Sequence, residues 1–217
     1  AGALGGQNQM NAGCARHLDE RITNSEGATL YTQQSGFVYG NTHGFVGGYP
    51  TTRHSLSCAV IAQQDDEMQR DYWYDSSRLA EQIASPEDIG RRAAERALAR
   101  LNGRKLGTRE CPVLFSAEIA TSLMRSLFSA IRGHAVYRKS TFLLDQVGQP
   151  LFPDWVTITE DPLRPRGQAS APFDNEGVAT AHRELVSDGV LQGYLLDSYS
   201  ARKLGLRSTA SAGGVHN

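Results

Sequence analysis

The densest group of residues capable of chemistry is the acidic stretch FDNEG, which contains Asp174, Asn175 and Glu176. Two carboxylates in different environments can divide acid and base roles between them. At positions i and i+2 of an extended segment they share a face, but a sequence such as xDNEGx equally forms an ordinary turn. A third interpretation is contact with a substrate or a second subunit, and it extends to the basic pair Arg138 and Lys139.

Two short His/Cys spacings raise the question of zinc. Cys14 and His17 form a C-x-x-H pair, and His54 and Cys58 form an H-x-x-x-C pair. The stretch HSLSCAVIA reads as a strand, in which four residues separate two side chains by about 13 Å, too far for one metal ion. No His-Glu pair occurs in the chain, and Walker, G-x-G-x-x-G and G-x-S-x-G motifs are absent. The residues themselves therefore indicate no nucleophile, and zinc is not expected at these His/Cys spacings.

Composition narrows the class of protein. The 217 residues, 40% of them hydrophobic, are enough for one large or two small domains with a buried core. A formal net charge of -1 gives no field that would concentrate nucleic acid, so direct nucleic-acid binding is not expected. Three scattered cysteines, Cys14, Cys58 and Cys111, favour a reducing compartment, and we expect a cytoplasmic location. No apolar run is long enough for a membrane helix, and both ends read as cuts through a longer protein.

The first half of the chain reads as a meander followed by a helix. Residues 21–75 alternate apolar and polar positions at period two, and we expect hairpin turns at NSEG (Asn24 to Gly27), GNTHG (Gly40 to Gly44) and QQDDE. Ser85 and Pro86 then start a helix whose Ile89, Ala93, Ala97 and Leu101 form one stripe, ended by Asn102 and Gly103. Its arginines are expected to form a solvated face.

The second half is expected to mix one helix with further strands. CPVLF (residues 111–115) reads as a short strand, and a helix from about Ala117 to Ile131 is apolar enough to be buried on more than one side. DWVTITED, ATAHRELVSDG and VLQGYLLD read as strands, with a hairpin turn at SDG (residues 187–189). The predicted fold class is α+β: an antiparallel strand meander plus helices over 1–105, then a second strand-rich α+β domain over 106–217, truncated.

Several long strings resemble the TldD/PmbA family of metallopeptidases from about Arg21 to the end of the chain. They are RITNSEGA, GNTHGFVGGY, TTRHSLSCAVIA, VYRKSTFLLD, PFDNEGVAT, DGVLQGYLLDSYSARKLGL and STASAGGVHN. The resemblance implies a cytoplasmic bacterial protein about twice this length. It also implies a heterodimer in which the TldD member holds zinc on an H-E-x-x-x-H helix. Together the two subunits are expected to degrade unfolded peptides and process a microcin precursor.

In an alignment anchored on YRKS, the three key positions of that zinc helix fall on Arg125, Ser126 and Ala130 of this sequence. These residues offer no metal ligand and no general base of suitable pKa. The resemblance therefore implies a non-catalytic subunit with no cofactor of its own, zinc being expected in a TldD-like partner. Unfolded peptides are the expected substrates of the pair, and no membrane partner is expected.

Two other functions stay open at this point. One is a metallopeptidase active by itself, with ligands from residues such as His134 and His216 or from missing segments. The other is a DNA gyrase-modulating binding protein, which is an older description of the family. His216 is also a candidate for substrate or subunit contact.

Overall fold

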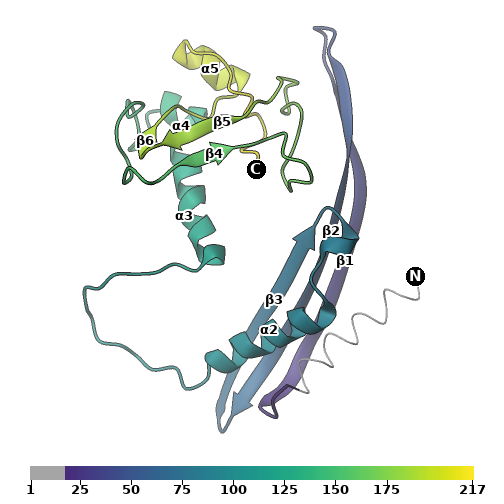
Figure 1. The fold of residues 1–217 in the computed structure, drawn as a ribbon. Helices are drawn as coiled ribbons and strands as arrows, with labels where there is room; N and C mark the ends of the chain where they lie inside the picture. Colours follow the sequence, from purple (N-terminus) through teal and green to yellow (C-terminus); the bar gives the residue numbers. More distant parts are fainter. Residues whose placement is uncertain (1–17) are drawn as a thin grey trace. The chain divides into compact units, whose positions relative to one another are not determined.

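A computed structural model describes residues 18–217 and shows strands first and mixed helices and strands afterwards (Figure 1). This confirms the predicted α+β class. The elements in chain order are β1 (Ile22–Gly40), β2 (Val46–Gln64), β3 (Glu67–Ser77), η1 (Ala80–Gln82), α2 (Pro86–Ala99), α3 (Ala117–Ala130), α4 (Gly133–Tyr137), β4 (Ile158–Glu160), β5 (Arg183–Ser187), β6 (Val190–Leu191) and α5 (Ser198–Leu204).

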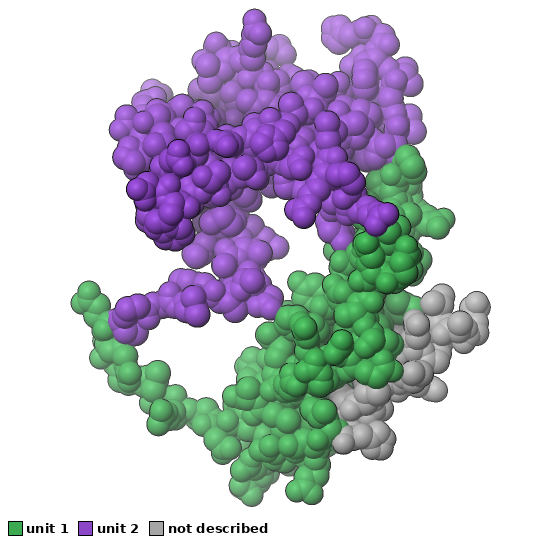
Figure 2. Space-filling model, in the orientation of Figure 1, with its two compact units in different colours: residues 1–36, 50–110 green, residues 37–49, 111–217 purple. Residues whose placement is uncertain are grey.

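The chain divides into two compact units (Figure 2). The first unit comprises Ala1–Gly36 and Pro50–Glu110, and the second comprises Phe37–Tyr49 and Cys111–Asn217. The tip of the β1–β2 hairpin therefore belongs to the second unit, although the sequence on both sides of it belongs to the first. We describe each unit by itself.

The first unit is a three-stranded sheet in the order β1-β2-β3, with α2 packed against β3. Alternating residues of β2 bury Leu56, Cys58, Val60 and Ala62 in one core with the predicted helix stripe. The helix begins as predicted, because Ser85 Oγ accepts the Asp88 N–H (3.2 Å) and proline follows at the first helical position. The strand and helix patterns in this half are thus confirmed.

Two of the three predicted turns of the meander are confirmed and one is wrong. GNTHG reverses the chain between β1 and β2, where the Asn41 N–H donates to the Phe45 carbonyl (3.0 Å), and Asp65 and Asp66 connect β2 to β3. NSEG instead lies inside β1. Ser25 Oγ donates to the Ala59 carbonyl and accepts the Gly27 N–H. These two bonds accommodate a local irregularity of the strand at Gly27, which has φ 97°. The chain therefore does not reverse at NSEG.

The arginines of α2 are exposed, as predicted, but two of them also form ion pairs with the sheet. Arg91 pairs along the helix with Asp88 and Glu95. Arg96 and Arg100 instead reach Asp71 of β3, at 3.2 and 3.5 Å. Long arginine stems can lie along apolar surface while the charged end finds a buried carboxylate, which the helix sequence by itself does not reveal.

The second unit packs α3, α4 and α5 with a small sheet in the order β4-β5-β6. Its core contains Leu127 and Ile131 from the end of the α3 segment and Leu185, Val186 and Leu191 from the strands. The predicted SDG turn is confirmed: it joins the antiparallel strands β5 and β6, with Asp188 and Gly189 both at positive φ.

Two predictions about residues 111–131 are wrong. CPVLF forms no strand, and Leu114 within it is 98% exposed; an apolar run needs a neighbouring strand, and none pairs with it in residues 18–217. The helix exists as α3, but Ile119 and Leu123 are exposed and only Leu127 and Ala130 are buried. Only the C-terminal half of α3 reaches the core of the second unit, so the helix is not buried on several sides.

Candidate functional site

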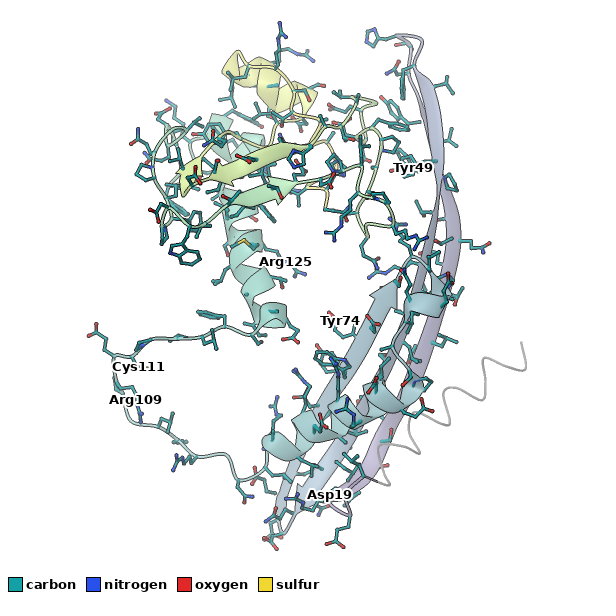
Figure 3. All side chains as sticks on the ribbon, in the orientation of Figure 1. Asp19, Tyr49, Tyr74, Arg109, Cys111 and Arg125 are labelled. Carbon is teal, nitrogen blue, oxygen red and sulfur yellow. The ribbon has the colours of Figure 1, made fainter. Side chains whose placement is uncertain are left out.

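The helix α3 carries the three positions on which the family resemblance places the zinc motif. Arg125 and Ser126 are exposed to solvent, and Figure 3 shows the Arg125 side chain extending from the helix. Ser126 Oγ donates to the Ser122 carbonyl one turn earlier (3.2 Å), and Ala130 is buried in the core. A guanidinium, a hydroxyl bonded to its own helix and a methyl group do not fit a zinc ion, so the family's metal chemistry has no ligands at these positions.

The acidic stretch forms an internally bonded loop. Asp174 is 1% exposed, and its carboxylate accepts the N–H groups of Glu176 (2.9 Å), Val178 (2.9 Å) and Ala212 (3.1 Å). The Asn175 N–H donates to the Ala212 carbonyl (3.0 Å), while the Asn175 residue is exposed. The Asp174 carboxylate therefore connects its own loop to the distant segment around Ala212. This agrees with the prediction that FDNEG forms a turn.

Glu176 and Asp197 organise the start of α5. Glu176 Oε2 accepts the Ser198 N–H (2.8 Å), and Asp197, the N-cap residue, accepts the Ser200 N–H (2.7 Å). Both carboxylates thus satisfy helix donors that would otherwise lack partners. The carboxylates of Asp174 and Glu176 thus accept backbone N–H groups from different segments.

The remaining predicted contact residues are the basic pair Arg138 and Lys139 and, much later in the chain, His216. Arg138 and Lys139 are exposed just after α4, and the Arg138 guanidinium lies 5.8 Å from the centre of the Tyr137 ring. The His216 N–H donates to Glu160 (2.7 Å), and its Nδ1 lies 3.2 Å from the Ala169 carbonyl. Contact of these residues with a substrate or a subunit stays a prediction, as it does for Asp174, Asn175 and Glu176.

Of the two His/Cys pairs considered as zinc ligands, the structure describes only His54 and Cys58. His54 and Cys58 both lie on β2, as predicted, and burial raises the pKa of the Cys58 thiol, so this sulfur is a poor ligand. Cys14 and His17 lie outside the described residues. Across residues 18–217, no group of three His, Cys, Asp or Glu side chains is placed to hold a metal ion.

The second unit contains a polar cavity of about 270 Å³ that sequence reasoning did not find. Its walls come from three separate segments, which explains why no local pattern revealed it. The lining residues are Arg132, Gly133, His134, Leu195, Asp197, Ser200, Ser211 and Gly213. We call it the Arg132 cavity.

The Asp197 carboxylate is the acidic group of this cavity. Burial raises the pKa of Asp197, but hydrogen bonds from Ser200 and the charge of His134 outweigh burial and lower it overall. Asp197 is therefore a carboxylate at neutral pH. The cavity then presents the negative charge of Asp197 together with the positive charge of Arg132.

Comparison with known protein families shows to which family the chain belongs. Residues 8–101 match the central domain of the PmbA/TldA metallopeptidases, and residues 108–217 match the C-terminal domain of the same family. The chain belongs to the PmbA/TldA metallopeptidase family. The resemblance seen in the sequence is thereby confirmed, and Arg125, Ser126 and Ala130 lie in the part matched by the C-terminal domain.

Individual PmbA/TldA relatives support the assignment. The chain is 51% identical over 203 residues to metalloprotease PmbA of Escherichia coli O157:H7, covering 94% of this chain and 45% of that protein. A Thermotoga maritima structure described as a modulator of a DNA gyrase is 27% identical, with a TM-score of 0.88, and the match covers 97% of this chain and 49% of that one. The structure of TldE from Thermococcus kodakarensis, 20% identical, shares the fold with a TM-score of 0.79, over 95% of this chain and 48% of that one.

This PmbA/TldA chain spans about half the length of the relatives that it matches. Within residues 18–217, no helix is both long and apolar enough to cross a membrane.

Proposed function

We propose that this chain is the non-catalytic subunit of a heterodimeric zinc metallopeptidase, whose TldD-like partner holds the metal. One observation carries the proposal: arginine, serine and alanine stand at the three positions where the resemblance places the zinc helix. Arginine has no lone pair to offer a cation, and serine cannot replace glutamate as a general base. The expected location of the pair is the cytoplasm.

The proposed role of this subunit is to hold unfolded peptides for the partner's active site. In the first unit β1 and β3 are edge strands, each with one neighbour in the described sheet. An extended peptide can pair with such an edge through main-chain hydrogen bonds that do not depend on its sequence. The second unit adds a larger cavity, of about 720 Å³, with Leu185, Tyr194 and Leu206 in a mainly apolar lining suited to apolar side chains.

The proposal extends to the substrates of the pair, which we expect to be unfolded peptides and a microcin precursor. Enclosure between two subunits would exclude folded proteins from the active site. The pair should therefore cleave an unfolded peptide and leave the same sequence intact inside a folded domain. Equal cleavage of both would contradict the enclosure.

Measurements of zinc content and peptide cleavage test whether the metal and the catalytic activity belong to the partner subunit. The chain purified by itself should contain no stoichiometric zinc and cleave no peptide, and both properties should appear when the TldD-like subunit is added. Replacing the histidines of the partner should abolish cleavage, whereas Arg125→Ala and Ser126→Ala in this chain should leave it within about twofold, because these side chains supply no chemistry. Zinc and cleavage in the chain by itself would overturn the proposal and favour an independent metallopeptidase using residues such as His134 and His216.

The gyrase-related description of the Thermotoga maritima relative motivates the second candidate, a gyrase-modulating protein. Capture experiments separate the two functions. Immobilised chain should retain the TldD-like subunit and should not retain gyrase when that subunit is absent. Retention of gyrase under those conditions would favour the second candidate.

A further inference from the structure

Two opposite charges share the Arg132 cavity without pairing with each other. Arg132 and Asp197 both line it, yet neither forms an ion pair with any residue in 18–217. In a cavity of about 270 Å³, an unpaired guanidinium and an unpaired carboxylate are each available to a ligand. A ligand carrying both charges would satisfy both groups.

The acidic wall of the cavity is held in place from two sides. Asp197 Oδ1 accepts both the N–H and the hydroxyl of Ser200, and no other residue of 18–217 donates to Oδ2. Behind it, Glu176 binds the Ser198 N–H. The free oxygen of Asp197 is thus positioned by the helix that it caps.

The basic wall is fixed by a close approach of α4 to α5. A Cβ at Gly133 would lie 2.6 Å from Ser200 Cβ and 2.7 Å from Leu196 Cδ2, so only glycine allows this packing. Arg132 and His134 flank Gly133, so their backbone is held beside the cavity while their side chains are exposed and can reach a ligand.

Size limits the ligand to a small molecule. The cavity of about 270 Å³ falls just below the ~300–1,000 Å³ of pockets for drug-sized ligands. Among small zwitterions, the backbone of an α-amino acid has its carboxylate and ammonium on one carbon atom. Such a molecule carries one group of opposite charge for each of the two charged side chains of the cavity.

We propose that the Arg132 cavity is a binding site for a small zwitterion of the α-amino acid class. Its carboxylate binds Arg132, with the His134 ring as a second donor, and its ammonium donates to Asp197 Oδ2. The site belongs to this chain and requires neither the peptidase partner nor a peptide substrate. Its occupancy is therefore independent of the proposed function.

Binding of three related probes to the chain tests the site, by calorimetry or by NMR shifts of the cavity residues. L-alanine should bind in the millimolar range. N-acetyl-L-alanine, which lacks the ammonium, and L-alaninamide, which lacks the carboxylate, should each bind at least about tenfold more weakly. Equal binding of the three probes, or no L-alanine binding up to about 10 mM, would overturn the proposal.

Two variants test the individual contacts. Arg132→Gln and Asp197→Asn should each weaken L-alanine binding at least about tenfold. Asparagine caps helices as well as aspartate, so Asp197→Asn should preserve α5. Arg202→Gln, an exposed arginine of α5 outside the cavity, is the matched control and should bind like the wild type. Unchanged binding in both cavity variants would assign the ligand to another site.

Discussion

Phe45 and Phe173 meet edge to face, with ring centroids 5.1 Å apart and ring planes at 76°. Phe45 lies at the tip of the β1–β2 hairpin, and Phe173 opens the FDNEG loop, both within the second unit. Phe37 and Tyr49 of the hairpin also contact Phe173, at 6.0 and 5.4 Å between centroids. The buried Phe173 ring thus holds the hairpin tip against the FDNEG loop within the second unit.

Replacing Phe173 by alanine should destabilise the protein by about 3–5 kcal/mol, because a buried ring is lost and a cavity is left. A double-mutant cycle with Phe45→Ala should give a coupling of about 0.5–1.5 kcal/mol, as edge-to-face pairs do. Denaturant unfolding of the four proteins measures both values. Val38→Ala, at a 75% exposed position of the same hairpin, should change stability by less than about 0.5 kcal/mol. Additive effects of Phe45 and Phe173 would contradict the contact.

Asp71 should make stability depend on pH. Burial raises the pKa of this carboxyl, but the Tyr72 N–H and the charges of Arg96 and Arg100 outweigh burial and lower it. A lowered pKa in the folded state adds stability above the unfolded value of about 3.9, and this stability is lost as the pH falls through the folded value. Asp71→Asn should therefore be about 1–3 kcal/mol less stable than the wild type at pH 6, with the difference closing below about pH 4.

The control for this experiment is Asp66→Asn, in the exposed turn between β2 and β3. It should leave the dependence of unfolding free energy on pH unchanged. A difference between wild type and Asp71→Asn that stays constant from pH 3 to pH 6 would show that Asp71 acts without its charge.

Gly189→Ala and Gly205→Ala separate a steric clash from backbone strain. Both glycines have positive φ, at 79° and 68°. A Cβ at Gly205 meets open space, so this variant should lose about 1 kcal/mol from strain alone. A Cβ at Gly189 would strike the carbonyl oxygens of Phe152 and Pro153, so this variant should lose about 1–3 kcal/mol more. Thermal unfolding measures the difference, and equal losses would contradict the close approach.

Asp174→Asn should destabilise the FDNEG loop. An amide presents one acceptor oxygen where the carboxylate serves three N–H donors, and an unsatisfied buried donor costs about 1–3 kcal/mol. Glu176→Gln keeps an acceptor for the Ser198 N–H and should cost less than about 1 kcal/mol. Amide hydrogen exchange at Val178 and Ala212 checks the mechanism. Oδ1 serves Val178 and Oδ2 serves Ala212, so the N–H that faces the new amide nitrogen should exchange faster in Asp174→Asn only. Unchanged exchange would contradict the role of Asp174 as the joint between the two segments.

Sequence reasoning succeeded where the signal is local. The Ser85–Pro86 helix start, the GNTHG and SDG turns and the alternation along β2 each depend on neighbouring residues. It failed where the outcome depends on distant partners. CPVLF is apolar but has no strand beside it, and the exposure of Ile119 reflects how little of α3 meets a core.

The candidate site also contains residues that could be predicted from the sequence and residues that could not. Arg125, Ser126 and Ala130 were found through resemblance to a family, and Asp174 was recognised as a turn residue or a contact. The Arg132 cavity could not be predicted, because residues 132–134, 195–200 and 211–213 become neighbours only after folding. Gly133, a small residue between two basic ones, was the one local signal of the close approach of α4 to α5.

The hairpin tip also has a consequence for biosynthesis. Phe45 leaves the ribosome well before Phe173, and at translation speeds of about 5–20 residues per second the delay is on the order of ten seconds. During that interval the aromatic tip has no Phe173 to cover it, so the nascent hairpin is a ready target for chaperones. A slow translation step placed between the two phenylalanines would lengthen this exposure and lower the yield of folded protein.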